Sequence, residues 1–273
     1  MGDMHSVLVG VDGSPESLRV VRDAAEEAAR RRWNLRIMHV VDVPAEPGAP
    51  ERIVTRAAEQ ARRSAPRVSL DTAVVIGDPA RVLVDGSRIA DLLVVGEPAG
   101  RIRPGGSVPA RVAATAGCPI LVLRGHSHAG GPVVAGVDGS PRGQPTLRLA
   151  AAEADRRGVE LVALHAWREP DATPLGDTAP LSHLTRPAEI EHRRLLADAV
   201  AGIAEEYPQV SLRRDARRGS ARRLLLACSR VAELVVVGRR GRYRIDALEP
   251  TSVSRHLVER SACPVLVVPG IAG

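Results

Sequence analysis

The chain repeats itself, and this repeat limits the fold more than any other feature of its 273 residues. The segment Val7 to Pro15 reads VLVGVDGSP and returns 126 positions later as Val133 to Pro141, VVAGVDGSP. His39 and His165 are related by the same offset, and each closes an apolar run. A domain usually has about 100 to 200 residues, so the duplication predicts two domains of similar fold.

The repeat continues towards the end of each copy with a larger offset. Asp91 to Gly96 matches Glu233 to Gly238 at an offset of 142, and Gly117 to Val122 matches Ala262 to Val267 at 145. The second copy therefore carries 16 extra residues in its middle and three more in a later loop.

The extra residues and the linker fix the expected domain boundaries. The 16 extra residues fall around Trp167 to Arg186, where several prolines favour a surface loop. Residues 125–131 read GHSHAGG, a composition typical of a linker. We therefore assign the first domain to residues 1–124 and the second to residues 132–273.

Each copy alternates short apolar strands with amphipathic helices, a pattern that predicts βαβ units and a parallel sheet. We expect strands at residues 6–11, 35–41, 69–75, 92–95 and 120–123 of the first copy, and at 132–137, 160–166, 210–214, 234–237 and 265–268 of the second. The predicted fold class is α/β, with two tandem, doubly wound, five-stranded parallel sheets.

A helix is expected to begin at Pro15, because proline is tolerated in a first helical turn and Ser14 is a suitable N-cap. Its apolar face comprises Leu18, Val21, Ala25 and Ala28. We expect the remaining side, Arg19, Arg22, Glu26, Arg30 and their neighbours, to face water.

Composition excludes several classes of protein. The net charge of +6 comes entirely from arginine, and the absence of lysine rules out a Walker-type P-loop. The three cysteines form no CxxC pair, so buried reduced thiols are expected rather than a disulfide framework. No stretch resembles a signal peptide or a membrane span, so we expect a cytoplasmic protein that does not contact membranes.

Three pairs of arginines raise the question of nucleic-acid binding: Arg213 and Arg214, Arg217 and Arg218, Arg222 and Arg223. Aromatic residues make up only 1% of the chain, which leaves few rings for base stacking. We interpret these pairs as a solvated surface and expect no nucleic-acid partner. An alternative is that Arg217 or Arg218 helps to neutralise a bound phosphate.

Catalytic and metal-binding signals are weak. His126 and His128 lie together in the linker, but two histidines without further ligands do not predict a metal site. His39 and His165 are expected to be structural. No motif pairs a nucleophile with a base, so we expect no efficient enzyme.

The turn after the fourth strand of the second copy favours phosphate binding. The sequence runs Gly238-Arg-Arg-Gly241, then nine residues, then Thr251-Ser252-Val253 at the start of a helix. Glycines allow the backbone to approach an anion, and helix N-termini attract phosphate. Ligands of parallel sheets bind at the carboxyl ends of strands, where this turn lies.

This arrangement resembles the ATP-binding signature of the universal stress protein family, Gly-2x-Gly-9x-Gly-Ser/Thr, and the resemblance covers nearly the whole chain. It implies Rossmann-like domains of the adenine nucleotide α-hydrolase type that bind ATP, with Mg²⁺. Asp138 would then contact the adenine or ribose, the Ala166 backbone would face the adenine, and Gly238, Gly241, Ser252 and Val253 would hold the phosphates. Thr251 departs from the pattern, because the family has glycine at its position.

The first copy departs further from the family pattern. Its counterparts of the site residues are Asp12, Val40, Gly96, Gly106, Ser107 and Val108. Glu97 would bring negative charge towards a triphosphate, and Pro98 removes an N–H donor. We expect weaker ATP binding in this copy, or none.

The resemblance implies an ATP-binding module of the stress response that signals to a protein partner with little or no catalysis. Two alternatives remain open: a nucleotide-independent interaction protein of the same fold, and a weak ATPase. The resemblance also implies internal pairing through the fifth strands, Ile120 to Leu123 and Val265 to Val268, and leaves open whether two chains form a homodimer.

Overall fold

The structure is a computed structural model, and it describes residues 5–42, 46–97, 107–168, 182–239 and 252–270. The chain forms two compact units. The first unit holds residues 1–124 and 264–269, and the second holds residues 125–263 and 270–273. The domain boundaries drawn from the sequence stay a prediction.

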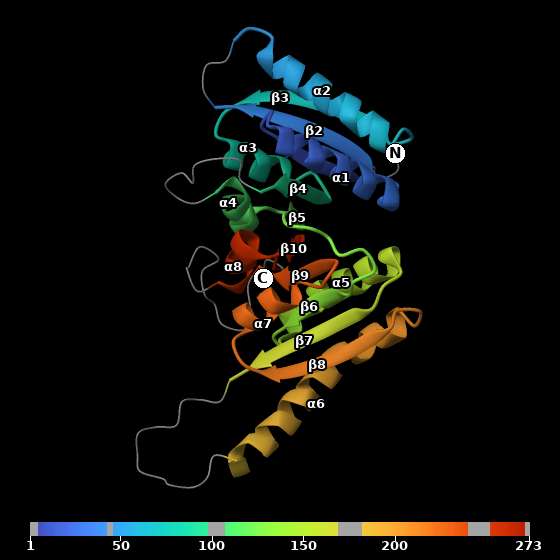
Figure 1. The fold of residues 1–273 in the computed structure, drawn as a ribbon, viewed down its shortest axis with the longest axis vertical. Helices are drawn as coiled ribbons and strands as arrows, with labels where there is room; N and C mark the ends of the chain where they lie inside the picture. The colour runs from blue at the N-terminus through green and yellow to red at the C-terminus, as the bar shows by residue number, and fades with distance from the viewer. Residues whose placement is uncertain (1–4, 43–45, 98–106, 169–181, 240–251, 271–273) are drawn as a thin grey trace, which may run out of the picture. The chain divides into compact units, whose positions relative to one another are not determined.

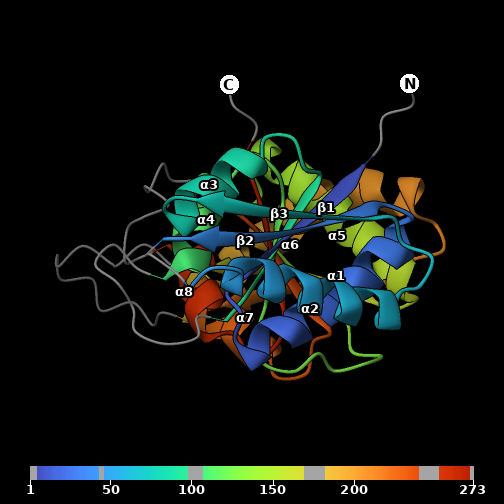
Figure 2. The ribbon, with the colours of Figure 1, turned by 90° about the horizontal axis from the view of Figure 1, so that it is seen from above.

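The first unit is a mostly parallel sheet with helices on both faces. Its elements are β1 (Ser6–Val11), α1 (Pro15–Arg31), β2 (Asn34–Val41), α2 (Ala49–Ser64), β3 (Leu70–Ile76), α3 (Pro79–Gly86), β4 (Leu92–Gly96), α4 (Val108–Thr115), β5 (Ile120–Leu123) and β10 (Val265–Val268). The strand order is β3-β2-β1-β4-β5-β10. Figure 2 shows α1 and α2 on one face of β2 and β3, with α3 and α4 on the other.

Strand β1 is the central strand of this unit, and β10 lies at its edge. Val7 of β1 pairs in parallel with Leu35 of β2 on one side and with Leu92 of β4 on the other. β10 pairs antiparallel with β5, with Val265 opposite Val122, which is the pairing of fifth strands that the sequence led us to expect. The strand order reverses at β1, so the carboxyl ends of β1 and β4 mark the topological switch point.

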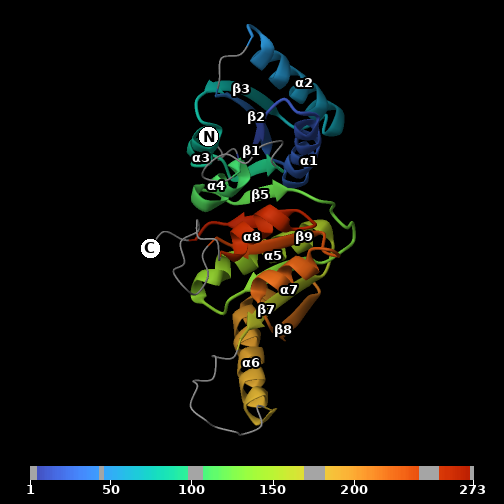
Figure 3. The ribbon, with the colours of Figure 1, turned by 60° about the vertical axis from the view of Figure 1, so that its left-hand side comes forward.

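The second unit repeats this plan. Its elements are β6 (Val133–Val137), the short 3₁₀ helix η1 (Pro141–Gly143), α5 (Gln144–Arg157), β7 (Leu161–Trp167), α6 (Ser182–Glu206), β8 (Leu212–Arg218), α7 (Ala221–Cys228), β9 (Leu234–Gly238) and α8 (Val253–Arg260). Strands β9-β6-β7-β8 are parallel neighbours, with Val133 paired to Leu161 and to Leu234. Figure 3 shows α6 alongside β7 and β8. The predicted α/β class is confirmed (Figure 1).

The cores are aliphatic, as the scarcity of aromatic residues requires. Buried leucine, isoleucine, valine and alanine fill the space between sheet and helices in both units. The largest fully buried side chains are Leu8, Leu35, Ile37, Leu93, Ile120, Leu147, Leu161, Leu164, Leu196, Leu234, Leu257 and Leu266. All three cysteines are free thiols, and Cys118 and Cys263 are buried.

Two sequence-based expectations about the second copy were wrong in detail. The expected surface loop around Trp167 to Arg186 ends earlier, because α6 begins at Ser182 and contains Pro187; residues 169–181 lie outside the described ranges. The strand expected at 210–214 is β8, which pairs with β7 as far as Arg218. Its arginines are tolerated because β8 is an edge strand with solvent-exposed positions.

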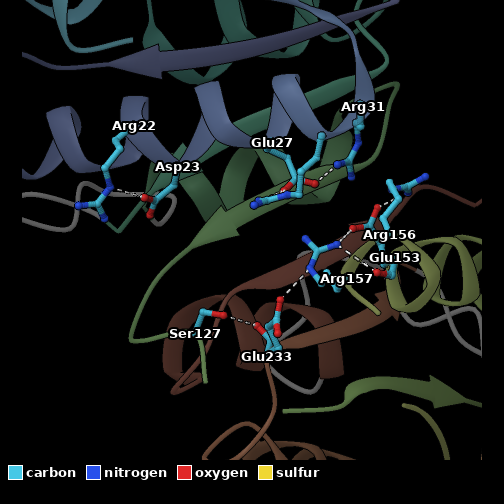
Figure 4. Close-up of polar contacts among 10 residues, drawn as sticks. Arg22, Asp23, Glu27, Arg31, Ser127, Glu153, Arg156, Arg157 and Glu233 are labelled. Atoms are coloured by element: carbon cyan, nitrogen blue, oxygen red, sulfur yellow. Dashed lines mark hydrogen bonds and ion pairs between the residues drawn. The ribbon is translucent and has the colours of Figure 1, made fainter. Parts of the chain in front are cut away.

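The four residues of α1 that we expected to face water, Arg19, Arg22, Glu26 and Arg30, are exposed, and a buried ion pair lies beside them. Glu27 is 1% exposed and bonds to Arg30 and Arg31, and the Arg31 side chain is only 4% exposed. In the second unit, Glu153 of α5 makes the equivalent contacts with Arg156 and Arg157 (Figure 4). The helical period does not predict this burial, because a charged group can be buried where its partner lies one turn away.

Candidate nucleotide site

A cavity of about 330 Å³ lies at the carboxyl ends of β1 and β4 in the first unit. The sequence predicts six site residues in the first copy, and five of them line this cavity: Asp12, Val40, Gly96, Ser107 and Val108. The sixth, Gly106, lies outside the described residues. The repeat therefore places these residues together at the switch point, where ligands of parallel sheets bind.

Asp12 and Asp138 shape the turn after the first strand in the same way. In the first unit, the backbone N–H and the hydroxyl of Ser14 donate to Oδ1 of Asp12, at 3.0 Å and 2.6 Å. In the second unit, Ser140 makes both bonds to Oδ1 of Asp138, at 2.9 Å and 2.8 Å. Both bonds use one carboxylate oxygen, Oδ1, of each aspartate.

His39 and His165 hold the same backbone in each unit. Nδ1 of His39 lies 2.9 Å from the carbonyl oxygen of Val11, and Nδ1 of His165 lies 2.8 Å from that of Val137. Both imidazoles are buried. They fix the end of the first strand against the second, the structural role that we expected for them.

The serines of the site cap helices. The hydroxyl oxygen of Ser107 accepts a hydrogen bond from the Ala110 backbone N–H at 3.4 Å, and Ser252 accepts one from Arg255 N–H at 3.4 Å. Helices α4 and α8 therefore begin at equivalent residues of the two copies. The first free N–H groups of a helix carry partial positive charge and favour an anion.

In the second unit the predicted residues stand at the ends of equivalent elements. Gly238 ends β9, Ala166 lies near the end of β7, and Ser252 and Val253 begin α8. Gly241 and Thr251, which the sequence also predicts for this site, lie outside the described residues.

The cavity of the first unit is acidic. Its lining includes four carboxylates, those of Asp12, Glu16, Asp42 and Glu97, together with one cation, Arg111. Arg111 donates to both carboxylate oxygens of Asp78, at 3.0 Å and 2.8 Å. Arg124 lies 3.9 Å from Glu97 and offsets part of its charge.

Sequence reasoning missed Glu16, Asp42 and Arg111 as lining residues, since no motif contains them. The signal was available in the repeat: comparison of the copies at the fixed offsets shows that each of these positions changes charge. Arg217, which the sequence offers together with Arg218 as a phosphate contact, donates to Asp215 at 2.8 Å, and this contact raises its pKa. The contact of either arginine with a phosphate stays a prediction.

Comparison with known proteins decides the family. The model of the universal stress protein family matches the chain twice, over residues 4–124 and 131–269. The chain belongs to the universal stress protein family. This confirms the resemblance inferred from the repeated motifs.

Relatives of the same family span the full tandem arrangement. A universal stress protein of Mycolicibacterium smegmatis is 33% identical over 97% of each chain. One from Mycobacterium tuberculosis is 33% identical over 96% of each chain. A crystal structure of a universal stress protein from Archaeoglobus fulgidus shares the fold, with a TM-score of 0.66 at 16% identity over 98% of this chain and 97% of that one.

Two further observations bear on partners of this universal stress protein. Among the helices of the described ranges, none is long and apolar enough to cross a membrane. Within those ranges, no three His, Cys, Asp or Glu side chains gather as a group that could hold a metal ion.

Proposed function

We propose that this universal stress protein binds ATP, with Mg²⁺, in its second copy and acts as a cytoplasmic signalling module with little or no catalysis. The observation that carries the proposal is the cavity of the first unit, which is lined by Asp12, Val40, Gly96, Ser107 and Val108. These positions correspond through the repeat to Asp138, Ala166, Gly238, Ser252 and Val253. The second copy adds the glycine-rich phosphate loop that the first has lost.

The proposed roles follow from chemistry at each position. The second carboxylate oxygen of Asp138 accepts from a ribose hydroxyl or the adenine amino group. The N-terminus of α8, capped by Ser252, faces the phosphates with its partial positive charge. Arg239, directly after Gly238, adds a full charge next to the same loop.

The absence of efficient catalysis is also part of the proposal. Catalysis of hydrolysis needs a group that activates water beside the γ-phosphate, and the only histidine on β7, His165, is buried against Val137. Binding without turnover suits a protein whose liganded state is read by a partner.

Thermal unfolding with and without Mg-ATP tests the proposal. A ligand that binds only the folded state stabilises it by about 2.7 kcal/mol at a hundredfold excess over Kd, so a rise in Tm is expected. The Gly238→Asp, Gly241→Asp double variant should lose this rise, because two carboxylates enter the phosphate loop. Gly202→Asp is the control, since Gly202 lies on exposed α6 with no atom near its missing Cβ.

The outcomes separate the candidate functions. A Tm rise that the double variant loses and the control keeps supports ATP binding in the second copy. No rise at millimolar Mg-ATP, with the protein folded and free of nucleotide, contradicts the proposal and favours a nucleotide-independent interaction protein. Phosphate release that survives repeated purification and disappears in the double variant favours a weak ATPase instead.

A further inference from the structure

We propose that the two copies take ligands of different charge: the second copy binds a nucleotide through its phosphates, and the first binds an uncharged adenine nucleoside. This inference rests on the proposed function and extends it to the first copy. Its basis is a reversal of charge between acids that line the cavity of the first unit and the residues that the repeat relates to them in the second copy.

The reversal affects three of the four acidic residues of the cavity. Glu16, Asp42 and Glu97 line it in the first unit, and the repeat offsets of 126, 126 and 142 relate them to Arg142, Arg168 and Arg239. The fourth, Asp12, corresponds to Asp138 and keeps its charge. Such a change at three separate positions, on three different connections, alters the potential of the whole site.

The cation that lines the first cavity, Arg111, adds no net positive charge there, and Arg124 offsets only part of the charge of Glu97. Arg111 is held by Asp78, so the pair contributes no net charge. In the second copy, His256 corresponds to Arg111 at an offset of 145, and Ser220 corresponds to Asp78 at an offset of 142. Burial, with Arg222 and Arg260 nearby, lowers the pKa of His256 and so favours its neutral form. At the corresponding positions the second copy thus has three arginines and one acid, whereas the first cavity has a neutral pair and four acids, of which Glu97 lies near Arg124.

The loops that follow the fourth strands do not reverse this difference. Residues 98–106 include Arg101 and Arg103 and no acid, and residues 240–251 include three arginines and two acids. The net charges of the two loops therefore differ by one, whereas an acid is replaced by an arginine at each of the three other positions. A triphosphate, with about four negative charges at neutral pH, is disfavoured in the first copy by the described residues.

The part of the site that would bind a nucleoside is retained in both copies. Asp12 and Asp138 make the same two hydrogen bonds through Oδ1, and His39 and His165 hold the same carbonyl. Carboxylates are acceptors that suit ribose hydroxyls, and an acidic residue at the end of a strand is a common ribose partner in related α/β sheets. The first copy therefore keeps the chemistry for a sugar and base while its charges oppose phosphate.

The size of the first cavity agrees with a ligand of this class. Small-molecule pockets range from roughly 300 to 1,000 Å³, and at about 330 Å³ this one lies near the lower limit. Its walls combine apolar atoms of Val20, Met38 and Leu83 with the carboxylates. An apolar pocket with a few polar groups suits a base stacked on aliphatic side chains and a sugar at the acidic rim.

Calorimetric titration with adenosine and with Mg-ATP tests the inference on the full chain. The chain with Gly238→Asp, Gly241→Asp and Asp138→Ala, in which the phosphate and nucleoside parts of the second site are both blocked, should bind one adenosine, and ATP at least tenfold more weakly. Adding Glu16→Arg, Asp42→Arg and Glu97→Arg gives the first copy the charges of the second. This charge-swapped chain should raise the ratio of ATP affinity to adenosine affinity at least tenfold.

A matched control separates local charge from net charge. Glu59→Arg, Asp71→Arg and Asp85→Arg change the same total charge at exposed residues of the first unit that do not line the cavity. This control should change the ratio less than twofold. Circular dichroism checks that every chain is folded.

Each outcome has a distinct meaning. If the blocked chain binds ATP as tightly as adenosine, or the control shifts the ratio as much as the charge swap, the inference is overturned. If the wild type binds one ATP and the blocked chain binds neither ligand, the inference fails and the proposed function stands. If the wild type binds no ATP and the blocked chain binds adenosine, the proposed function fails and the ligand of the first copy stands.

Discussion

Arg111 of α4 and Asp78 at the start of α3 form a bidentate ion pair, with hydrogen bonds of 3.0 Å and 2.8 Å. Asp78 is also the N-cap of α3, where its carboxylate accepts from the Arg81 backbone N–H at 2.9 Å. The Asp78 carboxylate thus caps α3 and also neutralises Arg111, the cation that lines the acidic cavity. The pair decides how much positive charge the first copy can offer to a ligand.

Asp78→Asn should improve ATP binding by the first copy. Asparagine caps a helix about as well as aspartate, so α3 should keep its cap while Arg111 loses its charged partner. We expect about a fivefold gain in ATP affinity, measured by calorimetry in the chain whose second site is blocked. Asp71→Asn is the control, because it breaks the exposed pair with Arg36. An equal gain in both variants would show that net charge, and not Arg111, causes the effect.

Glu153→Ala should be strongly destabilising. Glu153 is fully buried between Arg156 and Arg157, and Arg157 Nε also lies 3.4 Å from Glu233 (Figure 4). Removal of one partner of a buried pair leaves uncompensated charge and typically costs roughly 3 to 5 kcal/mol. Urea unfolding followed by circular dichroism measures this change in the free energy of unfolding.

The control for Glu153 is an ion pair of the same spacing on the surface. Glu189 and Arg193 lie four residues apart on α6, with side chains 41% and 67% exposed. Glu189→Ala should change the free energy of unfolding by less than about 1 kcal/mol. A loss at Glu153 as small as this would mean that the buried cluster relaxes towards water and does not hold α5.

The repeat made most of the fold predictable, and the buried charges show where such reasoning stops. Apolar runs at matching offsets located the strands to within a residue or two, because buried parallel strands have few polar positions. The pattern could not place Glu27 and Glu153, because their burial depends on arginines one turn away and on packing against the sheet. The sequence also missed the last four residues of β8, residues 215–218. Their arginine-rich composition does not favour a strand, but their pairing with β7 extends it.

Prediction of the site depended on two kinds of signal. The glycines and the Asp-Gly-Ser turn identified Asp12, Asp138 and Gly238 from the sequence. The backbone geometry of these turns favours these residue types, so they are visible as a motif. Glu16, Asp42 and Arg111 belong to no motif and join the site only through the three-dimensional arrangement of separate connections. Their place in the cavity therefore had to come from the structure, although the repeat shows that their charges differ between the copies.

Gly139→Ala should destabilise the second unit. Gly139 has φ of +74°, and an added Cβ would clash with Cδ2 of Leu195 on α6. The substitution therefore meets both a left-handed backbone and a packed side chain, and we expect a loss of about 2 kcal/mol or more. Gly158→Ala is the control: its φ is +65°, but no atom lies within 4 Å of the added Cβ. Equal losses in urea unfolding would show that backbone strain alone is responsible.

Cys118 should make the protein less stable at alkaline pH. Burial raises the pKa of its thiol to about 12, whereas a cysteine in an unfolded chain ionises near pH 8.5. Between these values the unfolded chain loses a proton that the folded chain keeps, so the free energy of unfolding falls as pH rises. The contribution is fully present below about pH 8.5 and decreases by about 1.4 kcal/mol for each further pH unit.

Cys118→Ala isolates this effect from other titrations. The variant has a smaller core side chain and should be less stable than the wild type at pH 8, but its stability should depend less on pH. Between pH 8 and pH 10 the wild type should lose about 2 kcal/mol more than Cys118→Ala in urea unfolding, as expected for one buried thiol. Parallel losses in the two proteins would mean that water reaches Cys118 in the folded state and lets its thiol ionise there.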